Sequence, residues 1–494
     1  TSLVRLFLEG LTGQADVVRG ACEALFTPRP LGPIGDMTSD LPPGLAAQIH
    51  SGNAYNGLFP SFFSFLRERT RPAIVVIEDA HWADEATLDF IKYVGRRIDG
   101  ARALLVVTLR DDELGLDHPL RLVLGDLPVA TTRRVLLAPF SRHTVESLAR
   151  AAGRDAGELQ RLTGGNPLYL SEMLASPDEL VPASVRDAVL ARFGRLSSTA
   201  QRLVELVSIE PGSLERHVVN AVMGQPENAI REAADGGVLR IEDGRLAFRH
   251  EIARQCIETE LPFDRRLTLH AHVLDVLQGQ NGKTSGLARQ VHHAIGAGRV
   301  EDVAALAPLA AEEAARLGSH REAAALYRRA LEVSGPAVTS SRATLLEACA
   351  SESQKTGALR EAIQLREEAL ELRLAAGDRL NEGTNLRLLG VLRRQSSGDK
   401  EVYLRLARAA VHTLQPLGPS GELAKSYASL SHALCLLSRY DEAIDWGEKA
   451  VALSQARSDP GALALALNRH GAALLYKTNN VRARAQLERA LALA

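Results

Sequence analysis

Two consecutive carboxylates, Glu78 and Asp79, follow an uninterrupted apolar run at residues 73–77. Such a run, without polar alternation, is typical of a parallel strand that is covered on both faces. Open α/β sheets bind ligands at the carboxyl ends of their strands, where acidic residues can hold Mg²⁺ and orient a water molecule beside a nucleotide's phosphates. The alternative is that Glu78 and Asp79 only cap the next helix.

Arg110 follows a second apolar run, residues 103–107, and is therefore expected at the same edge of the sheet. A guanidinium group in this place could reach a terminal phosphate. The alternative for Arg110 is a surface side chain that pairs with Asp111 or Asp112.

The elements around these residues predict an α/β region over residues 1–140. Asp84 is placed to cap a helix between the two apolar runs, and apolar residues follow it at helical spacing at Leu88, Ile91 and Val94. Residues 133–137 and 16–19 are further candidate strands. Residues 27–60 are rich in proline and glycine, which predicts an irregular surface loop.

The next two regions, residues 141–177 and 178–262, have helical patterns, and the second ends in a predicted hairpin. Its two strands flank Glu242-Asp243-Gly244, where Asp-Gly favours a tight turn. Helices followed by a two-stranded ribbon are the outline of a winged helix, which either binds DNA or packs against neighbouring domains.

The remaining residues, 263–494, are predicted to be helical and repetitive. Five sets of mostly small or apolar residues at spacing i, i+4, i+7 begin 39 to 41 residues apart, and a small residue lies twelve positions before each set. Small residues at a fixed phase let helices cross closely, and this period indicates stacked helical hairpins. The sets begin at Ala323, Ala362, Val402, Ala443 and Ala483, and the preceding small residues are Ala311, Ala350, Gly390, Ser431 and Gly471.

Composition narrows the class of protein. The 494 residues include 58 Lys+Arg and 60 Asp+Glu, and this near-neutral balance argues against one large nucleic-acid-coating surface. No run of about 18 apolar residues occurs, so no membrane span is predicted. Four widely spaced cysteines indicate free thiols in a reducing, cytoplasmic compartment. His292 and His293 are adjacent on a predicted helix, so we expect them to point in different directions and to make a poor metal site.

Both ends of the chain favour a fragment of a longer protein. The first residues already form an amphipathic helical pattern with no initial methionine, and the last residues stop inside another helical pattern. The P-loop pattern G-x-x-x-x-G-K-S/T, which cradles phosphates, does not occur.

Four segments together resemble the large ATP-binding regulators of the LuxR/MalT type, which belong to the STAND branch of AAA-like signalling NTPases. Residues 78–84 resemble their Walker B segment, residues 163–170 their helical-lid motif, and residues 248–251 the end of their winged helix. Residues 1–5 resemble the segment directly after Gly-Lys in their Walker A loop. The resemblance implies a P-loop NTPase core truncated at its amino terminus (1–140), a helical lid (141–177), a winged helix (178–262) and an all-α TPR-like superhelix (263–494).

The resemblance also implies residue roles. Thr1, with Ser2 beside it, would belong to the P-loop, and the Thr1 hydroxyl would bind Mg²⁺ together with Glu78. Asp79 would be the base or the water-positioning acid, although Glu78 and Asp79 could exchange roles. Arg110 would be the sensor on the strand after Walker B. The nucleotide would also be contacted from the lid by Asn166 and Pro167 and from the winged helix by His250, whose alternative is an ordinary half-buried histidine.

The function implied is a cytoplasmic, ATP-binding regulator of transcription that switches between a closed ADP form and an open, self-associating ATP form, with slow ATP hydrolysis. An inducer or a regulatory protein would bind the repeats, and DNA would be bound only by a carboxyl-terminal helix-turn-helix that this chain lacks. One alternative is a non-enzymatic TPR-like scaffold with a degenerate NTPase domain. Another is the same module coupled to a cyclase or kinase domain.

Overall fold

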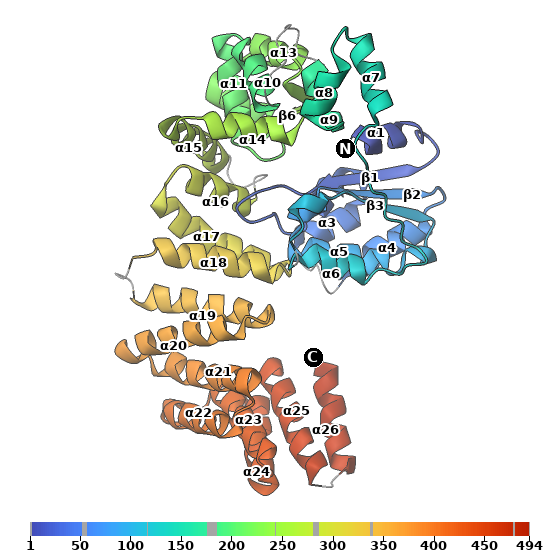
Figure 1. Cartoon of the computed structure of the whole chain (residues 1–494). Helices are drawn as coiled ribbons and strands as arrows, with labels where there is room; N and C mark the ends of the chain where they lie inside the picture. Colours follow the sequence, from blue (N-terminus) through green and yellow to red (C-terminus); the bar gives the residue numbers. More distant parts are fainter. Residues whose placement is uncertain are drawn as a thin grey trace. The chain divides into compact units, whose positions relative to one another are not determined.

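Helices dominate the computed structural model of the chain, and two small sheets lie in its amino-terminal half (Figure 1). The chain divides into two compact units, residues 1–319 and 320–494. The structure describes residues 2–51, 57–115, 117–174, 185–242, 244–279, 286–335, 339–477 and 480–493.

The first sheet is parallel, with strand order β1-β2-β3. The central strand β2 (Ala73–Glu78) is buried along its whole length, whereas the edge strand β3 (Ala103–Val107) is mostly half-buried. Helix α5 (Glu85–Gly95) connects them and β1 (Asp16–Ala21) lies on the other side of β2, which confirms the predicted strands at 73–77, 103–107 and 16–19.

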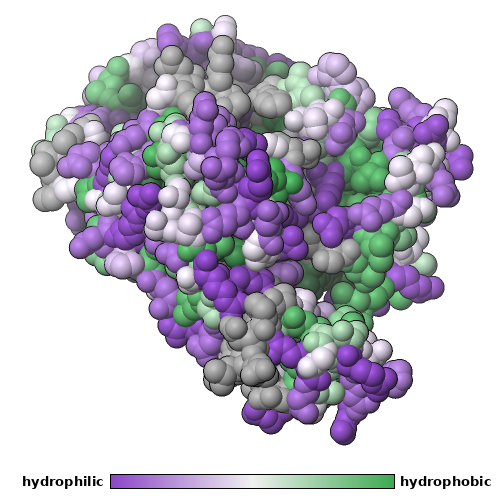
Figure 2. All heavy atoms as spheres, turned by 90° about the horizontal axis from the view of Figure 1, so that it is seen from above, coloured by the Kyte–Doolittle hydropathy of each residue, from purple (hydrophilic) through white to green (hydrophobic). Residues whose placement is uncertain are grey.

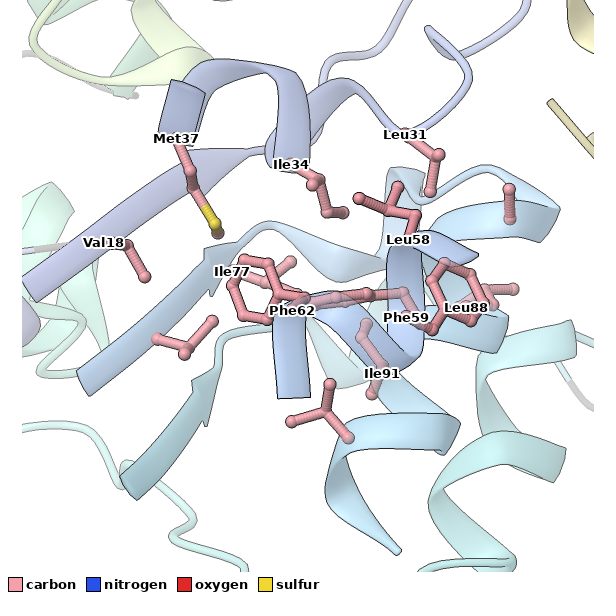
Figure 3. Close-up of a cluster of buried hydrophobic side chains, with 14 of the residues drawn as sticks. Val18, Leu31, Ile34, Met37, Leu58, Phe59, Phe62, Ile77, Leu88 and Ile91 are labelled. Carbon is pink, nitrogen blue, oxygen red and sulfur yellow. The ribbon is translucent and has the colours of Figure 1, made fainter. Parts of the chain in front are cut away.

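The prediction of an irregular surface loop at residues 27–60 is wrong. Ile34 and Met37 from this segment are fully buried and pack with Phe62, Ile77 and Ile91 in the core of the α/β region (Figure 3). Apolar side chains between the prolines and glycines gain from burial, and this gain outweighs the local turn preference. The segment forms α2 (Gly32–Asp36), a 3-10 turn (Met37–Asp40), α3 (Pro43–Ser51) and the start of α4 (Phe59–Glu68).

The candidate strand at residues 133–137 is also wrong, since this segment has no regular structure. Val135, Leu136 and Leu137 are about three-quarters exposed (75%, 73% and 73%). A strand needs a hydrogen-bonded neighbour, and within the described residues the sheet ends at β3. The predicted first helix is confirmed as α1 (Ser2–Glu9), but its apolar residues Leu3, Leu6 and Phe7 are exposed.

Short helices complete the α/β region and follow it. They are the 3-10 turns Ala80–Trp82, Ile98–Gly100 and Asp111–Glu113, then α6 (Pro119–Gly125), α7 (Arg142–Ala151), α8 (Ala156–Thr163) and α9 (Pro167–Leu174). The domain boundary predicted at 177/178 lies outside the described residues.

A second, antiparallel sheet with strand order β4-β6-β5 follows among helices. The predicted hairpin is confirmed, with Glu242 opposite Arg245, although Asp243 of its turn lies outside the described residues. The elements are α10 (Val185–Gly194), α11 (Ser198–Ser208), β4 (Leu214–Glu215), α12 (Arg216–Met223), α13 (Glu227–Asp235), β5 (Leu239–Glu242), β6 (Arg245–Phe248) and α14 (Glu251–Glu260).

Helical hairpins fill the rest of the chain, and they confirm the predicted TPR-like repeats. The small residues predicted at helix crossings are buried, and a Cβ atom added to Gly447 would lie 3.1 Å from the Cα atom of His470 on the next helix. The helices are α15 (Phe263–Gly279), α16 (Leu287–Gly296) and α17 (Val300–Arg316) in the first unit, and α18 (His320–Val333), α19 (Thr339–Lys355), α20 (Leu359–Ala375), α21 (Arg379–Ser397), α22 (Lys400–Leu414), the 3-10 turn Gln415–Leu417, α23 (Gly421–Leu436), α24 (Tyr440–Ala456), α25 (Pro460–Tyr476) and α26 (Asn480–Leu493) in the second.

One repeat set is shifted by one residue from the prediction. On α22 the predicted Val402 is only half-buried, whereas Tyr403, Ala407 and Ala410 are buried. The Tyr403 ring lies against Gly390, since a Cβ atom at Gly390 would be 3.0 Å from Tyr403 Cδ2. The glycine accepts a large side chain here, and this pairing sets the register of the hairpin.

The surface is mixed in character. On the face shown in Figure 2, hydrophilic residues predominate and hydrophobic ones occur in smaller groups between them. Among the described residues, no helix combines the length and apolar character that crossing a bilayer would require.

Candidate functional site

The carboxyl edge of the parallel sheet brings Glu78 and Asp79 next to the segment that carries Arg110. Residues Ile77 and Val107 are register partners, so the strands β2 and β3 end side by side. The Asp79 backbone N–H donates a hydrogen bond of 2.9 Å to Thr108 Oγ1. The ends of two adjacent strands therefore bring together Glu78, Asp79 and the segment that carries Arg110, as predicted. We call this carboxyl edge of the sheet the rim.

Glu78 is almost completely buried, with 2% of its surface exposed. Arg19 on β1 donates from Nε to Glu78 Oε1 over 2.7 Å, and this charge-assisted bond fixes the orientation of the carboxylate. Arg19 was not predicted as a site residue. The available signal was a charged residue inside a candidate strand, next to the strand that carries the acids.

Asp79 has a left-handed backbone conformation, with φ 53° and ψ 43°. Aspartate tolerates this region better than most residues, but the conformation is strained, and such strain gathers at functional sites. Burial, opposed by the charges of His81 and Arg110, raises the pKa of the Asp79 carboxyl, and the neighbouring Glu78 raises it further. Burial is therefore the main cause of the raised pKa of Asp79.

Arg110 pairs with Glu113, whereas its alternative was a pair with Asp111 or Asp112; the side chain of Asp112 lies outside the described residues. Arg110 Nη1 donates to Glu113 Oε1 over 2.8 Å, and its guanidinium group lies 5.9 Å from the centre of the Trp82 ring. The same Glu113 approaches His81, with Oε2 3.3 Å from Nε2. Burial lowers the pKa of His81, and the nearby Arg110 contributes to this shift.

Asp84 is confirmed as the cap of α5 and does more than cap it. Its buried carboxylate accepts hydrogen bonds from the backbone N–H groups of Ala86 and Thr87, from Leu31 N over 3.1 Å and from Ser319 Oγ over 2.6 Å. Burial raises the pKa of Asp84, and these hydrogen bonds oppose the rise. Asp84 therefore joins the start of α5 to two segments that are distant in sequence, at Leu31 and at Ser319.

The predicted lid motif forms a tight turn between α8 and α9. Gly165 has φ 78°, and a Cβ atom there would lie 2.4 Å from the Phe140 carbonyl oxygen, so only glycine fits. Asn166 follows and its Oδ1 accepts from Tyr169 N over 3.5 Å, while Pro167 begins α9 and is exposed.

His250 immediately precedes α14 and is half-buried. Burial lowers the pKa of His250, and the charges of Arg192, Arg249 and Arg240 lower it further. A small pocket is lined by His250 together with Arg192 and Arg249. The pocket is otherwise lined mostly by apolar residues, and Arg192 and Arg249 place positive charge beside the imidazole.

Two further predicted residues lie at the amino terminus. Thr1 is outside the described residues, and Ser2 is described only by its backbone, as the first residue of α1.

The expectation that His292 and His293 make a poor metal site is wrong in its geometry. Ligand nitrogens of His270, His292 and His293 all lie within 4.8 Å of one another. His270 on α15 supplies the third ring, and no local sequence pattern places it beside α16.

Comparisons with known proteins give distant similarities. No protein-family model matches the chain. An uncharacterized protein of Rhizobium meliloti (strain 1021) is 26% identical over 296 residues, which is 54% of this chain and 28% of that protein. The chain thus spans less than a third of this relative's length.

Among solved structures, the chain is similar to a Signal Transduction ATPase with Numerous Domains (STAND) with a tetratricopeptide repeat sensor from Pyrococcus horikoshii. The TM-score is 0.41 at 16% identity, over 93% of this chain and 80% of that one. It is also similar to BtubC from P. vanneervenii, with a TM-score of 0.35 and 20% identity over 47% of this chain and 91% of that one. Neither similarity identifies an activity, so a function has to be inferred from the residues of the site.

Proposed function

We propose that the chain is the central part of an ATP- and ADP-controlled switch of the LuxR/MalT type that regulates transcription. The rim formed by Glu78, Asp79 and the Arg110 segment at the carboxyl edge of the parallel sheet carries this proposal. Such an edge is where open α/β sheets bind nucleotides.

The donor set of the rim suits Mg²⁺. Two neighbouring carboxylates offer hard oxygen ligands of the kind that Mg²⁺ prefers. Glu78 and the Thr1 hydroxyl would hold the ion, Asp79 would position or deprotonate a water molecule, and Arg110 would bind a terminal phosphate. Mg²⁺, when bound, would neutralise charge on the phosphate oxygens.

The lid and the segment around His250 would respond to the nucleotide. The arginines beside His250 favour an anion such as the diphosphate of ADP, and Asn166 and Pro167 would contact the nucleotide from the lid. ADP would hold the closed form, and ATP the open, self-associating form, because a ligand shifts such an equilibrium only by its different affinity for the two states. DNA would be bound by a helix-turn-helix outside this chain.

The repeats of the second unit would carry the sensor. Arg366, Arg387 and Arg394 each keep a buried Nε atom that has no hydrogen-bond partner among the described residues. Burial and the charge of Arg387 lower the pKa of Arg366, which is about 10. Arg387 is also paired with Glu422, and the remaining guanidinium groups would suit an acidic inducer or a regulatory protein with an acidic surface.

A scaffold without nucleotide chemistry is the second candidate, and the Arg19–Glu78 bond favours it, because Glu78 already has a cationic partner. Nucleotide binding separates the two. We expect a form of the protein extended upstream of Thr1 to bind Mg·ATP and to hydrolyse it slowly. If the protein is a scaffold, we expect that neither this chain nor the extended form binds a nucleotide. ATP should then have no effect on partner binding by the repeats.

A further inference from the structure

We propose that His270, His292 and His293 form a binding site for a divalent transition-metal ion, with Zn²⁺ as the best fit. His270 lies on α15, and His292 and His293 lie on α16. Their ligand nitrogens are all within 4.8 Å of one another. Imidazole nitrogens are common ligands of zinc, and three histidines are a known set for one ion.

The ring arrangement suits a single ion. The ring centroids of His270–His292, His270–His293 and His292–His293 are 5.5, 5.1 and 5.2 Å apart. Three imidazoles that bind a tetrahedral zinc ion at about 2.1 Å place their ring centres about 5 Å apart. His270 Nδ1 and His293 Nδ1 are 2.9 Å apart, so a separation of about 3.3 Å, as tetrahedral ligands require, needs only a small outward movement.

One nitrogen of the cluster lacks a partner. His292 Nε2 is shielded from solvent and has no hydrogen-bond partner among the described residues. His292 also forms a hydrogen bond with the backbone of Ile209, which orients its ring. Buried polar atoms are almost always satisfied, so this nitrogen points to a ligand.

The carboxylate of Glu210 orients the ring of His293. Glu210 Oε2 and His293 Nε2 are 2.9 Å apart, so His293 donates from Nε2, and its Nδ1 accepts the hydrogen bond from His270 Nδ1 that a metal ion would replace. Arg289 in turn donates to both oxygens of Glu210. Histidines that bind metals usually donate their second nitrogen to such a carboxylate, which fixes the tautomer.

The charges around the cluster are compatible with a cation. Two buried arginines lie in this region, and each is already paired with two carboxylates. Arg289 pairs with Glu210 and Glu215, and Arg254 pairs with Glu251 and Glu258. Arg245 also pairs with Glu215, and the charge of Arg266 acts on His270, so the guanidinium groups and the carboxylates of this region balance one another. Bound metal would join α15 to α16 and, through Glu210, to the segment after α11.

Titration of the metal-stripped chain with Co²⁺ tests the proposal, because tetrahedral Co²⁺ has a characteristic visible absorption. We expect one equivalent to bind, Zn²⁺ to displace it, and His292→Ala to weaken Zn²⁺ at least about tenfold. His272→Ala is the matched control, since His272 is an exposed residue on the same helix as His270, and it should bind as the unmodified chain does.

A second variant and a second measurement separate metal binding from folding. His292→Gln keeps a polar side chain but lacks the imidazole, and it should bind as weakly as His292→Ala. Zn²⁺ should raise the Tm of the unmodified chain and leave that of both His292 variants unchanged, while all keep the same circular dichroism spectrum without metal. Absence of stoichiometric binding, or equal binding by the His292 variants, would show that the cluster is only a hydrogen-bonded part of the core.

Discussion

Arg19 on β1 and Glu78 at the end of β2 form an ion pair across two neighbouring parallel strands, with Arg19 Nε 2.7 Å from Glu78 Oε1. The glutamate side chain is 3% exposed and the arginine 36%. The pair lies at the rim where we propose that Mg²⁺ and phosphates bind. It stabilises the rim before any ligand arrives, and it competes with a cation for the carboxylate.

Replacing Arg19 with methionine should destabilise the chain. Glu78 would lose its charged partner in a buried position, which we expect to lower the free energy of unfolding by about 1–3 kcal/mol, measured by urea denaturation. Arg142→Met is the control, because Arg142 forms an exposed pair with Glu146 and its loss should cost less than about 0.5 kcal/mol. Equal effects of the two substitutions would contradict a structural role for the Arg19–Glu78 pair.

Gly447→Ala should destabilise the repeats. The new Cβ atom would lie 3.0 Å from Cβ and 3.1 Å from Cα of His470, and the backbone of α25 cannot easily move away. Alanine gains about 1 kcal/mol of helix propensity, but overpacking costs about 1–3 kcal/mol, so we expect a net loss seen as a lower Tm. Gly461→Ala, whose Cβ would meet only Asp459 Oδ1 at 3.6 Å, serves as the control. A higher Tm for Gly447→Ala would refute the close crossing.

His432 should make the second unit sensitive to acid. Burial, followed by the charges of Arg469 and Arg394, lowers the pKa of His432 to about 3, whereas an unfolded histidine has a pKa of about 6.5. Between these values the unfolded chain binds a proton that the folded chain does not, so the free energy of unfolding falls as the pH falls through this window.

Urea titrations at pH 7 and pH 5 measure the contribution of His432 to the pH dependence of the free energy of unfolding. His432→Gln should reduce the loss of stability between the two pH values by about 2 kcal/mol. His412→Gln, at an exposed position on α22, should leave the loss unchanged. An identical pH dependence in both variants would assign the acid sensitivity to other groups.

The positive charge of the repeats should bind acidic peptides. Arg394 and Arg469 act on the same His432, so they lie near one another. The double variant Arg394→Ala/Arg469→Ala should bind a fluorescent glutamate-rich peptide at least about tenfold more weakly, and salt should weaken binding to the unmodified chain. Arg405→Ala/Arg457→Ala removes two exposed arginines and should change little. Comparable losses in both double variants would mean that net charge, rather than this cluster, attracts the peptide.

Local sequence signals predicted much of the fold. The uninterrupted apolar run of β2, the Asp84 cap of α5 and the Asp-Gly hairpin each depend on neighbours in the chain, and each is present. The repeats were predictable because the same crossing recurs every 40 residues or so, and a small residue is needed each time.

The structure differs from the sequence-based predictions where contacts between residues far apart in the chain determine the local structure. Proline and glycine predicted a loop around Ile34 and Met37, but the core formed with α4 and α5 buries both side chains. The apolar segment 133–137 has strand-like residues without a described strand beside it. Arg19 pairs with a residue 59 positions away, and His270 with one 23 positions away, so no pattern within a short window reveals either contact.

Equilibrium binding of Mg·ATP to a form extended upstream of Thr1 tests the central claim most directly. We expect binding that depends on Mg²⁺. The combination of Glu78→Gln and Asp79→Asn should raise the Kd for Mg·ATP at least about a hundredfold, because both changes remove charge from the proposed ion ligands while keeping side-chain size. Arg142→Ala, remote in sequence and exposed, should bind normally. Binding of Mg·ATP that is unchanged in the double variant would contradict the account.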